Sequence, residues 1–217
     1  LDEEVDLAQL AEAGHAATLG NVDRQYEVAV PEQFDIVLVG LPSIGPYNVD
    51  SVLNPILVQC LSTGYFFNFY RHRPLVRRGG VMIVDHPLEN EFHLVHHPSY
   101  FDFFNDLLPQ TRDPAELERR FEKSYAENEW YIHLYRNSYA YHGVHPFYMW
   151  YWGAHGMAHL GKVIAVRPKS AYAARLIGFE VAESMEDAIE TARDFVGGQA
   201  RMCYFHCPPI MMCSLPA

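Results

Sequence analysis

A polar loop after a short apolar run carries the strongest candidates for binding chemistry. Residues 35–39 are almost continuously apolar and stop at a glycine, which is typical of a strand buried on both faces of a parallel sheet. A hydroxyl, a phenol, an amide and a carboxylate follow, on Ser43, Tyr47, Asn48 and Asp50. At the carboxyl end of a strand such groups could orient a hydroxy acid or hold a phosphate edge. The alternative is that Asn48 or Asp50 only caps the next helix.

His86 follows a second apolar run, 81–84, and should lie beside the first loop if the two strands are neighbours. It could carry a proton or ligate a metal, or it could be an ordinary hydrogen-bonded loop histidine. Arg167 and Lys169 come just after a third run, 163–166, and either could pair with a substrate carboxylate. All three side chains are therefore candidate substrate-binding groups.

His142 and His145 flank a glycine before a predicted helix, and we expect them to be pocket residues. Other histidines invite a metal interpretation. The spacing of residues 93, 96 and 97 matches no standard ligand set. His155 and His159 share one helical face, but no glutamate follows His155 as in the zinc-protease pattern. We therefore predict no metal site in this chain.

The net charge, the length of the apolar runs and the cysteine spacing argue against several classes of protein. The formal net charge is -11 over 217 residues, which argues against general nucleic-acid binding, since backbone phosphates require a basic face. No apolar run reaches the ~20 residues of a membrane-spanning helix. The four cysteines form no C-x-x-C pair and suit reduced thiols, so we expect a cytoplasmic protein with no membrane partner.

Alternating strands and helices position these residues. The expected strands are 26–30, 35–39, 81–84, 163–166 and 200–205, and the expected helices are 1–14, 49–61, 101–108, 113–135, 145–160, 171–177 and 188–196. This order predicts a doubly wound α/β fold, Rossmann-like, with a mostly parallel sheet and helices on both faces. The candidate loops should then meet at the carboxyl edge of the sheet.

The order of these segments resembles the carboxy-terminal domain of the nickel-dependent lactate racemase family, over about Phe34 to Pro216. The resemblance is carried by a collinear series of segments: FDIVLVGLP, PLVRRGGVMIV, DPAELERRF, HGVHPFYMW, KVIAV and IGFEVAESMEDAIETARDFVG. The chain departs from the family at Leu41, where the family loop has tyrosine, and it has no lysine in 49–62. The family's substrate-facing glutamine and lysine therefore have no counterpart here.

The resemblance implies a 2-hydroxy acid racemase or epimerase, in which a nickel-pincer nucleotide takes a hydride from the substrate carbon and returns it to the other face. The lysine that carries this cofactor and the catalytic histidines would belong to an amino-terminal domain. We therefore expect 1–30 to be a remnant of, or link to, that missing domain and 31–217 to be the racemase-like domain. The chain opens at Leu1 rather than Met, which also suggests a fragment.

Expected partners are a small hydroxy acid and the missing domain, with homo-oligomerisation left open. The fragment alone should be inactive and should hold no cofactor. The first alternative is a non-catalytic small-molecule-binding domain that kept the fold and lost the chemistry, which the missing helix lysine favours. The second is a hydrolase or transferase that uses the regions of His86 and His142.

Overall fold

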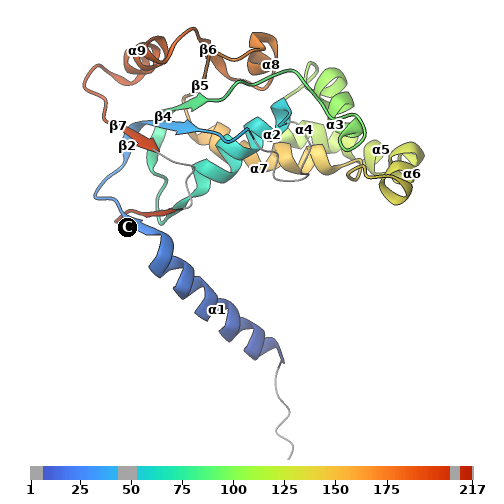
Figure 1. The fold of residues 1–217 in the computed structure, drawn as a ribbon, viewed down its shortest axis with the longest axis horizontal. Helices are drawn as coiled ribbons and strands as arrows, with labels where there is room; N and C mark the ends of the chain where they lie inside the picture. The colour runs from blue at the N-terminus through green and yellow to red at the C-terminus, as the bar shows by residue number, and fades with distance from the viewer. Residues whose placement is uncertain (1–6, 44–52, 206–210, 217) are drawn as a thin grey trace, which may run out of the picture.

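The chain folds around a five-stranded parallel sheet. The structure is a computed structural model that describes residues 7–43, 53–205 and 211–216 (Figure 1). The strands are β2 (Phe34–Gly40), β4 (Val76–Asp85), β5 (Lys162–Val166), β6 (Glu180–Ala182) and β7 (Met202–Phe205), in the order β6-β5-β4-β2-β7. Every neighbouring pair is parallel. The predicted doubly wound α/β fold is thereby confirmed.

Side-chain alternation along β2 explains why both faces of the sheet are covered. Ile36 and Leu38 point to one face, where they are buried with Ala188 and Ala192 of α9 (Met185–Val196). Residues 37 and 39 point to the other face and join the larger core. Figure 1 shows α9 on one side of the sheet and α7 (His145–His159) on the opposite side. A strand covered on both faces must be apolar at successive positions, as 36–39 is.

The larger core is closed by helices that approach one another very closely. α2 (Pro55–Gln59) continues as a π-helix, η1 (Cys60–Tyr65), and a 3-10 turn, η2 (Phe66–Asn68). Three glycines allow η1 and α2 to lie directly against α7: Gly64, Gly153 and Gly156. A Cβ on Gly156 would lie 2.3 Å from the carbonyl oxygen of Thr63, so only glycine fits there.

The beginning of α2 differs from the prediction for 49–61. Asn54 is the N-cap, because its side-chain oxygen accepts from the N–H groups of Ile56 and Leu57 at 3.1 and 3.2 Å. Pro55 occupies the first helical position, where its missing N–H costs nothing. The cap of α2 is therefore Asn54. Asn48 and Asp50, the predicted caps, lie outside the described part of the chain.

The N-terminal segment also differs from its prediction. α1 (Leu7–Tyr26) passes through Gly14, the expected stop, because a glycine on an exposed helix weakens it without ending it. Figure 1 shows α1 projecting from the rest of the protein. β1 (Glu27–Ala29) joins a small parallel sheet of order β1-β8-β3, with β8 (Met212–Ser214) and β3 (Tyr70–Arg71), and not the main sheet.

The single helix predicted for 113–135 is broken. It forms α4 (Pro114–Leu117), η4 (Glu118–Glu122), α5 (Lys123–Ala126) and α6 (Glu129–Asn137). The break lies at Asn128, whose side chain accepts from the N–H groups of Trp130 and Tyr131 and so starts α6. The remaining helices are α3 (Pro98–Asp102), η3 (Phe103–Leu107) and α8 (Ala171–Leu176). No described helix is long and apolar enough to cross a membrane.

Gly156→Ala tests the close helix contact. We expect it to lower the free energy of unfolding by about 1–3 kcal/mol, since the added methyl group meets a backbone oxygen that cannot move freely. Urea unfolding followed by circular dichroism measures this change. Gly14→Ala is the matched control, because nothing lies within 4 Å of its added methyl group. Equal effects of the two substitutions would contradict the proposed packing.

Candidate functional site

The carboxyl ends of β2, β4 and β5 are joined by backbone hydrogen bonds beyond the strands themselves. The N–H of Leu41 donates to the carbonyl of Asp85 at 3.1 Å, which ties the loop after β2 to the end of β4. The N–H groups of Lys169 and Ser170 donate to the carbonyls of Pro87 and Leu88, at 2.5 and 3.1 Å. These bonds hold the three loops together at one edge of the sheet.

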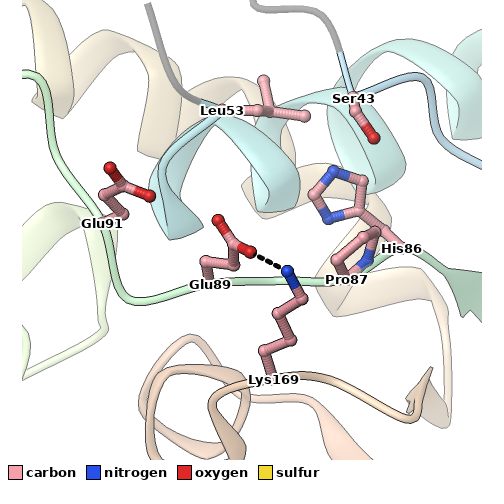
Figure 2. Close-up of a pocket in the computed structure, with 7 residues that line it drawn as sticks. All are labelled: Ser43, Leu53, His86, Pro87, Glu89, Glu91 and Lys169. Atoms are coloured by element: carbon pink, nitrogen blue, oxygen red, sulfur yellow. Dashed lines mark hydrogen bonds and ion pairs between the residues drawn. The ribbon is translucent and has the colours of Figure 1, made fainter.

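A pocket of about 230 Å³ lies at this edge, and we name it the carboxyl-edge pocket (Figure 2). Its lining residues are Ser43, Leu53, His86, Pro87, Glu89, Glu91 and Lys169. Three of the predicted site residues, Ser43, His86 and Lys169, thus meet in one place, each from the end of a different strand. Leu53, Pro87, Glu89 and Glu91 were not among the predicted substrate-binding residues, although both glutamates follow His86 in the same loop.

His86 is the most constrained group of the pocket. Its Nδ1 accepts from the N–H of Leu88 at 2.9 Å, so in the neutral ring the proton sits on Nε2. Nε2 is buried and has no partner among the described residues. Burial lowers the pKa of His86 to about 4, against the opposing effect of the nearby Glu89 and Asp85 carboxylates. At neutral pH His86 is therefore an uncharged hydrogen-bond donor.

Lys169 supplies the positive charge of the pocket. Its ammonium forms an ion pair with the Glu89 carboxylate, drawn as a dashed line in Figure 2. The hydrogen bond and charge of Lys169 lower the pKa of Glu89, and those of Glu89 raise the pKa of Lys169. Glu91 adds a second carboxylate to the lining. A ligand carboxylate would therefore have to displace Glu89 from Lys169.

Three predicted site residues that the structure describes, Arg167, His142 and His145, do not line this pocket. Arg167 is exposed just beyond β5, with φ of 46°, and its N–H donates to the carbonyl of Ala182 at 2.8 Å. Tyr47, Asn48 and Asp50 lie outside the described residues. Of the two cations predicted to meet a substrate carboxylate, Lys169 is the one that lines the carboxyl-edge pocket.

His145 lies in a separate aromatic cluster between α3 and α7, and the ring of His142 packs against Tyr135 of α6. The Tyr100 hydroxyl lies 2.5 Å from Nδ1 of His145, and burial lowers the pKa of this histidine to about 4. His142 Nδ1 accepts from the N–H of Val144 at 3.4 Å. The histidines at 93, 96 and 97 pack in the same region, and His97 is fully buried. Their surroundings are aromatic, as expected of structural side chains.

The described residues offer no ligand set for nickel. No group of three or more histidine, cysteine, aspartate or glutamate side chains in that part of the chain is placed to hold a metal ion. His155 and His159 have different neighbours: Nε2 of His155 is 3.5 Å from the Tyr70 hydroxyl, and Nε2 of His159 is 2.9 Å from the Val76 carbonyl. The donor set of the described residues does not fit a nickel cofactor.

Comparison with known proteins adds a distant structural likeness. No family model matches the sequence, and no curated protein matches it. The structure is similar to that of the lactate racemase apoprotein from Thermoanaerobacterium thermosaccharolyticum, with a TM-score of 0.52 and 14% sequence identity. The match covers 94% of this chain and 40% of that chain. The chain therefore has a racemase-like fold and spans less than half the length of that racemase.

The pH dependence of stability tests the burial of His86. The pKa of His86 is about 4 in the folded chain and 6.5 in the unfolded chain. Between these two pH values the unfolded chain therefore binds a proton at His86 that the folded chain does not bind. Stability supplied by neutral His86 is therefore complete above pH 6.5 and lost towards pH 4, by about 3 kcal/mol at most. His86→Asn, which can still accept from the Leu88 N–H, should make stability fall less between these two pH values.

Urea unfolding at several pH values measures this difference between wild type and variant. His133→Asn, on an exposed side chain of α6, is the matched control and should leave the wild-type profile unchanged. An identical pH profile for His86→Asn and wild type would mean that His86 is not held neutral by burial.

Proposed function

We propose that this chain is the carboxy-terminal α/β domain of a 2-hydroxy acid racemase- or epimerase-like protein. Its carboxyl-edge pocket would close over a reaction centre that a separate amino-terminal domain supplies. The observation that carries the proposal is the convergence of Ser43, His86 and Lys169 at the edge where parallel α/β sheets bind ligands. The racemase-like fold, matched over 94% of this chain but 40% of the racemase, supports it.

In this proposal the pocket binds and orients the substrate. Lys169 exchanges its Glu89 partner for the substrate carboxylate, and the Nε2–H of His86 donates to a substrate oxygen. A hydrogen bond from this buried donor would be strong, because water does not compete for it. His86 cannot serve as a base, since Nδ1 is occupied by the Leu88 N–H and Nε2 already carries a proton. Proton transfer and the nickel-pincer nucleotide would therefore belong to the other domain.

A non-catalytic binding domain is the second candidate, and a specific observation favours it. Glu89 already neutralises Lys169, and Glu91 adds a further negative charge. Because the two glutamates outweigh the one lysine, the pocket suits a neutral ligand rich in hydroxyl groups at least as well as an anion. Such a domain would bind small polyols or hydroxy acids through His86 and Ser43 without taking part in turnover.

Substitution of the ion pair separates the two candidates. In the full-length protein we expect Lys169→Gln to raise KM for a 2-hydroxy acid about tenfold or more, because a charged hydrogen bond to the carboxylate is lost. Glu89→Gln should lower KM, because it frees Lys169. Racemisation is followed by polarimetry or chiral chromatography on a panel of 2-hydroxy acids.

The surface pair Lys123 and Glu127 provides matched controls, since both side chains are exposed. Lys123→Gln and Glu127→Gln should leave KM at the wild-type value. Turnover that is insensitive to Lys169 would contradict the assigned substrate contact. Ligand binding without turnover in the full-length protein would instead support the non-catalytic binding domain.

A further inference from the structure

A second pocket lies among the helices on the α7 side of the sheet, and we name it the helical pocket. It encloses about 390 Å³, within the range of small-ligand sites. None of the residues that the structure describes lines both this pocket and the carboxyl-edge pocket. Its lining residues are Gln59, Arg112, Asp113, Pro114, Trp150, Ala154, Met157, Ala158, Ile177 and Gly178. Most of this wall is apolar, with one amide, one guanidinium and one carboxylate.

The amide is that of Gln59 on α2. Gln59 is only 1% exposed, and its Oε1 has no hydrogen-bond partner among the described residues. The side chain is fixed against α7, because a Cβ on Gly153 would lie 2.1 Å from Nε2. A buried amide without a partner is unfavourable in an empty protein interior. A ligand in the helical pocket could supply the missing hydrogen bonds.

The guanidinium is that of Arg112, just before α4. A Cβ added to Gly178 would lie 2.9 Å from Nη1 of Arg112, so a larger residue would crowd the guanidinium. The φ of Gly178 is +92°, a backbone conformation that also favours glycine. The Trp150 Nε1–H donates to the carbonyl of Arg112 at 3.0 Å and so anchors its backbone. The absence of a side chain at Gly178 therefore leaves room for the Arg112 side chain at the pocket.

Arg112 has no acidic partner at ion-pair distance in the described part of the chain. Asp113 also lines the pocket, but its carboxylate accepts from the N–H of Glu116 at 2.8 Å and caps α4. The cation of the helical pocket is thus available for an anion that enters from solvent.

We propose that the helical pocket binds a small carboxylate with an apolar body and a second hydrogen-bonding group. Arg112 pairs with the carboxylate, Trp150 and Met157 cover the apolar body, and the Gln59 amide bonds to a hydroxyl. This assignment does not depend on the racemase-like function, because the two pockets are built from different residues. It gives the chain a second binding site for a more apolar ligand than a small hydroxy acid.

Three probes test the two polar contacts separately in the full chain. They are 4-hydroxyphenylacetate, phenylacetate without the hydroxyl, and 2-(4-hydroxyphenyl)ethanol without the carboxylate. Dissociation constants come from isothermal titration calorimetry. We expect 4-hydroxyphenylacetate to bind tightest and each simpler probe to bind about tenfold more weakly, because each lacks one hydrogen-bonding contact. Equal affinities, or no binding at millimolar concentration, would overturn the proposal.

Two variants assign each contact. Gln59→Met, of similar shape, should remove the preference for 4-hydroxyphenylacetate over phenylacetate without lowering stability, because Oε1 of Gln59 has no partner among the described residues. Arg112→Gln should remove the preference for the acid over the alcohol. Arg136→Gln, on the exposed end of α6, should leave all three constants unchanged. Unaltered preferences in the first two variants, or a destabilised Gln59→Met, would contradict the assigned contacts.

Discussion

The candidate site depends on the parallel register of β2, β4 and β5. Because these strands are neighbours and run in one direction, their carboxyl ends lie at one edge of the sheet. Backbone bonds from Leu41, Lys169 and Ser170 then fix the loops to one another. Residues from three distant parts of the sequence thereby become the wall of one pocket. A shift in register would separate them, whatever their side chains.

Burial decides the chemistry of the carboxyl-edge pocket. Two nearby carboxylates favour a charged His86, yet the loss of water around the ring outweighs them and keeps it neutral. The Leu88 N–H then selects the tautomer that presents Nε2–H. Lys169, in contrast, is exposed and keeps its charge beside Glu89. The carboxyl-edge pocket thus combines a neutral buried donor, His86, with an exposed cation, Lys169. This combination suits recognition of a polar ligand better than proton transfer.

The central strands could be predicted from sequence because the part of each strand that is covered on both faces is a run of successive apolar residues. The runs 35–39, 81–84 and 163–166 lie within β2, β4 and β5. β6 could not be found in this way, because it is a three-residue edge strand with an exposed glutamate. The break at Asn128 was also missed, because apolar periodicity continues across it while the side chain starts a new helix.

Candidate site residues could be predicted where a position just after a central strand was enough to place the residue at the pocket. Ser43, His86 and Lys169 each follow a central strand, so the topology alone brings them together. His142 lies just before α7 and His145 is its first residue, and the sequence does not say which neighbours that helix end will have. In the structure their neighbours are aromatic rings, among them Tyr100 and Tyr135. The burial that sets the properties of His86 also depends on packing that no local pattern reveals.

The most direct test is the protonation state and tautomer of His86, read from long-range proton–nitrogen NMR of the imidazole at neutral pH. The measurement is made on the full-length protein with and without a 2-hydroxy acid. The account predicts a neutral ring with the proton on Nε2 and a shift of that proton's resonance when the ligand binds. A charged ring, a proton on Nδ1, or ligand binding that leaves the His86 resonances unmoved would contradict it.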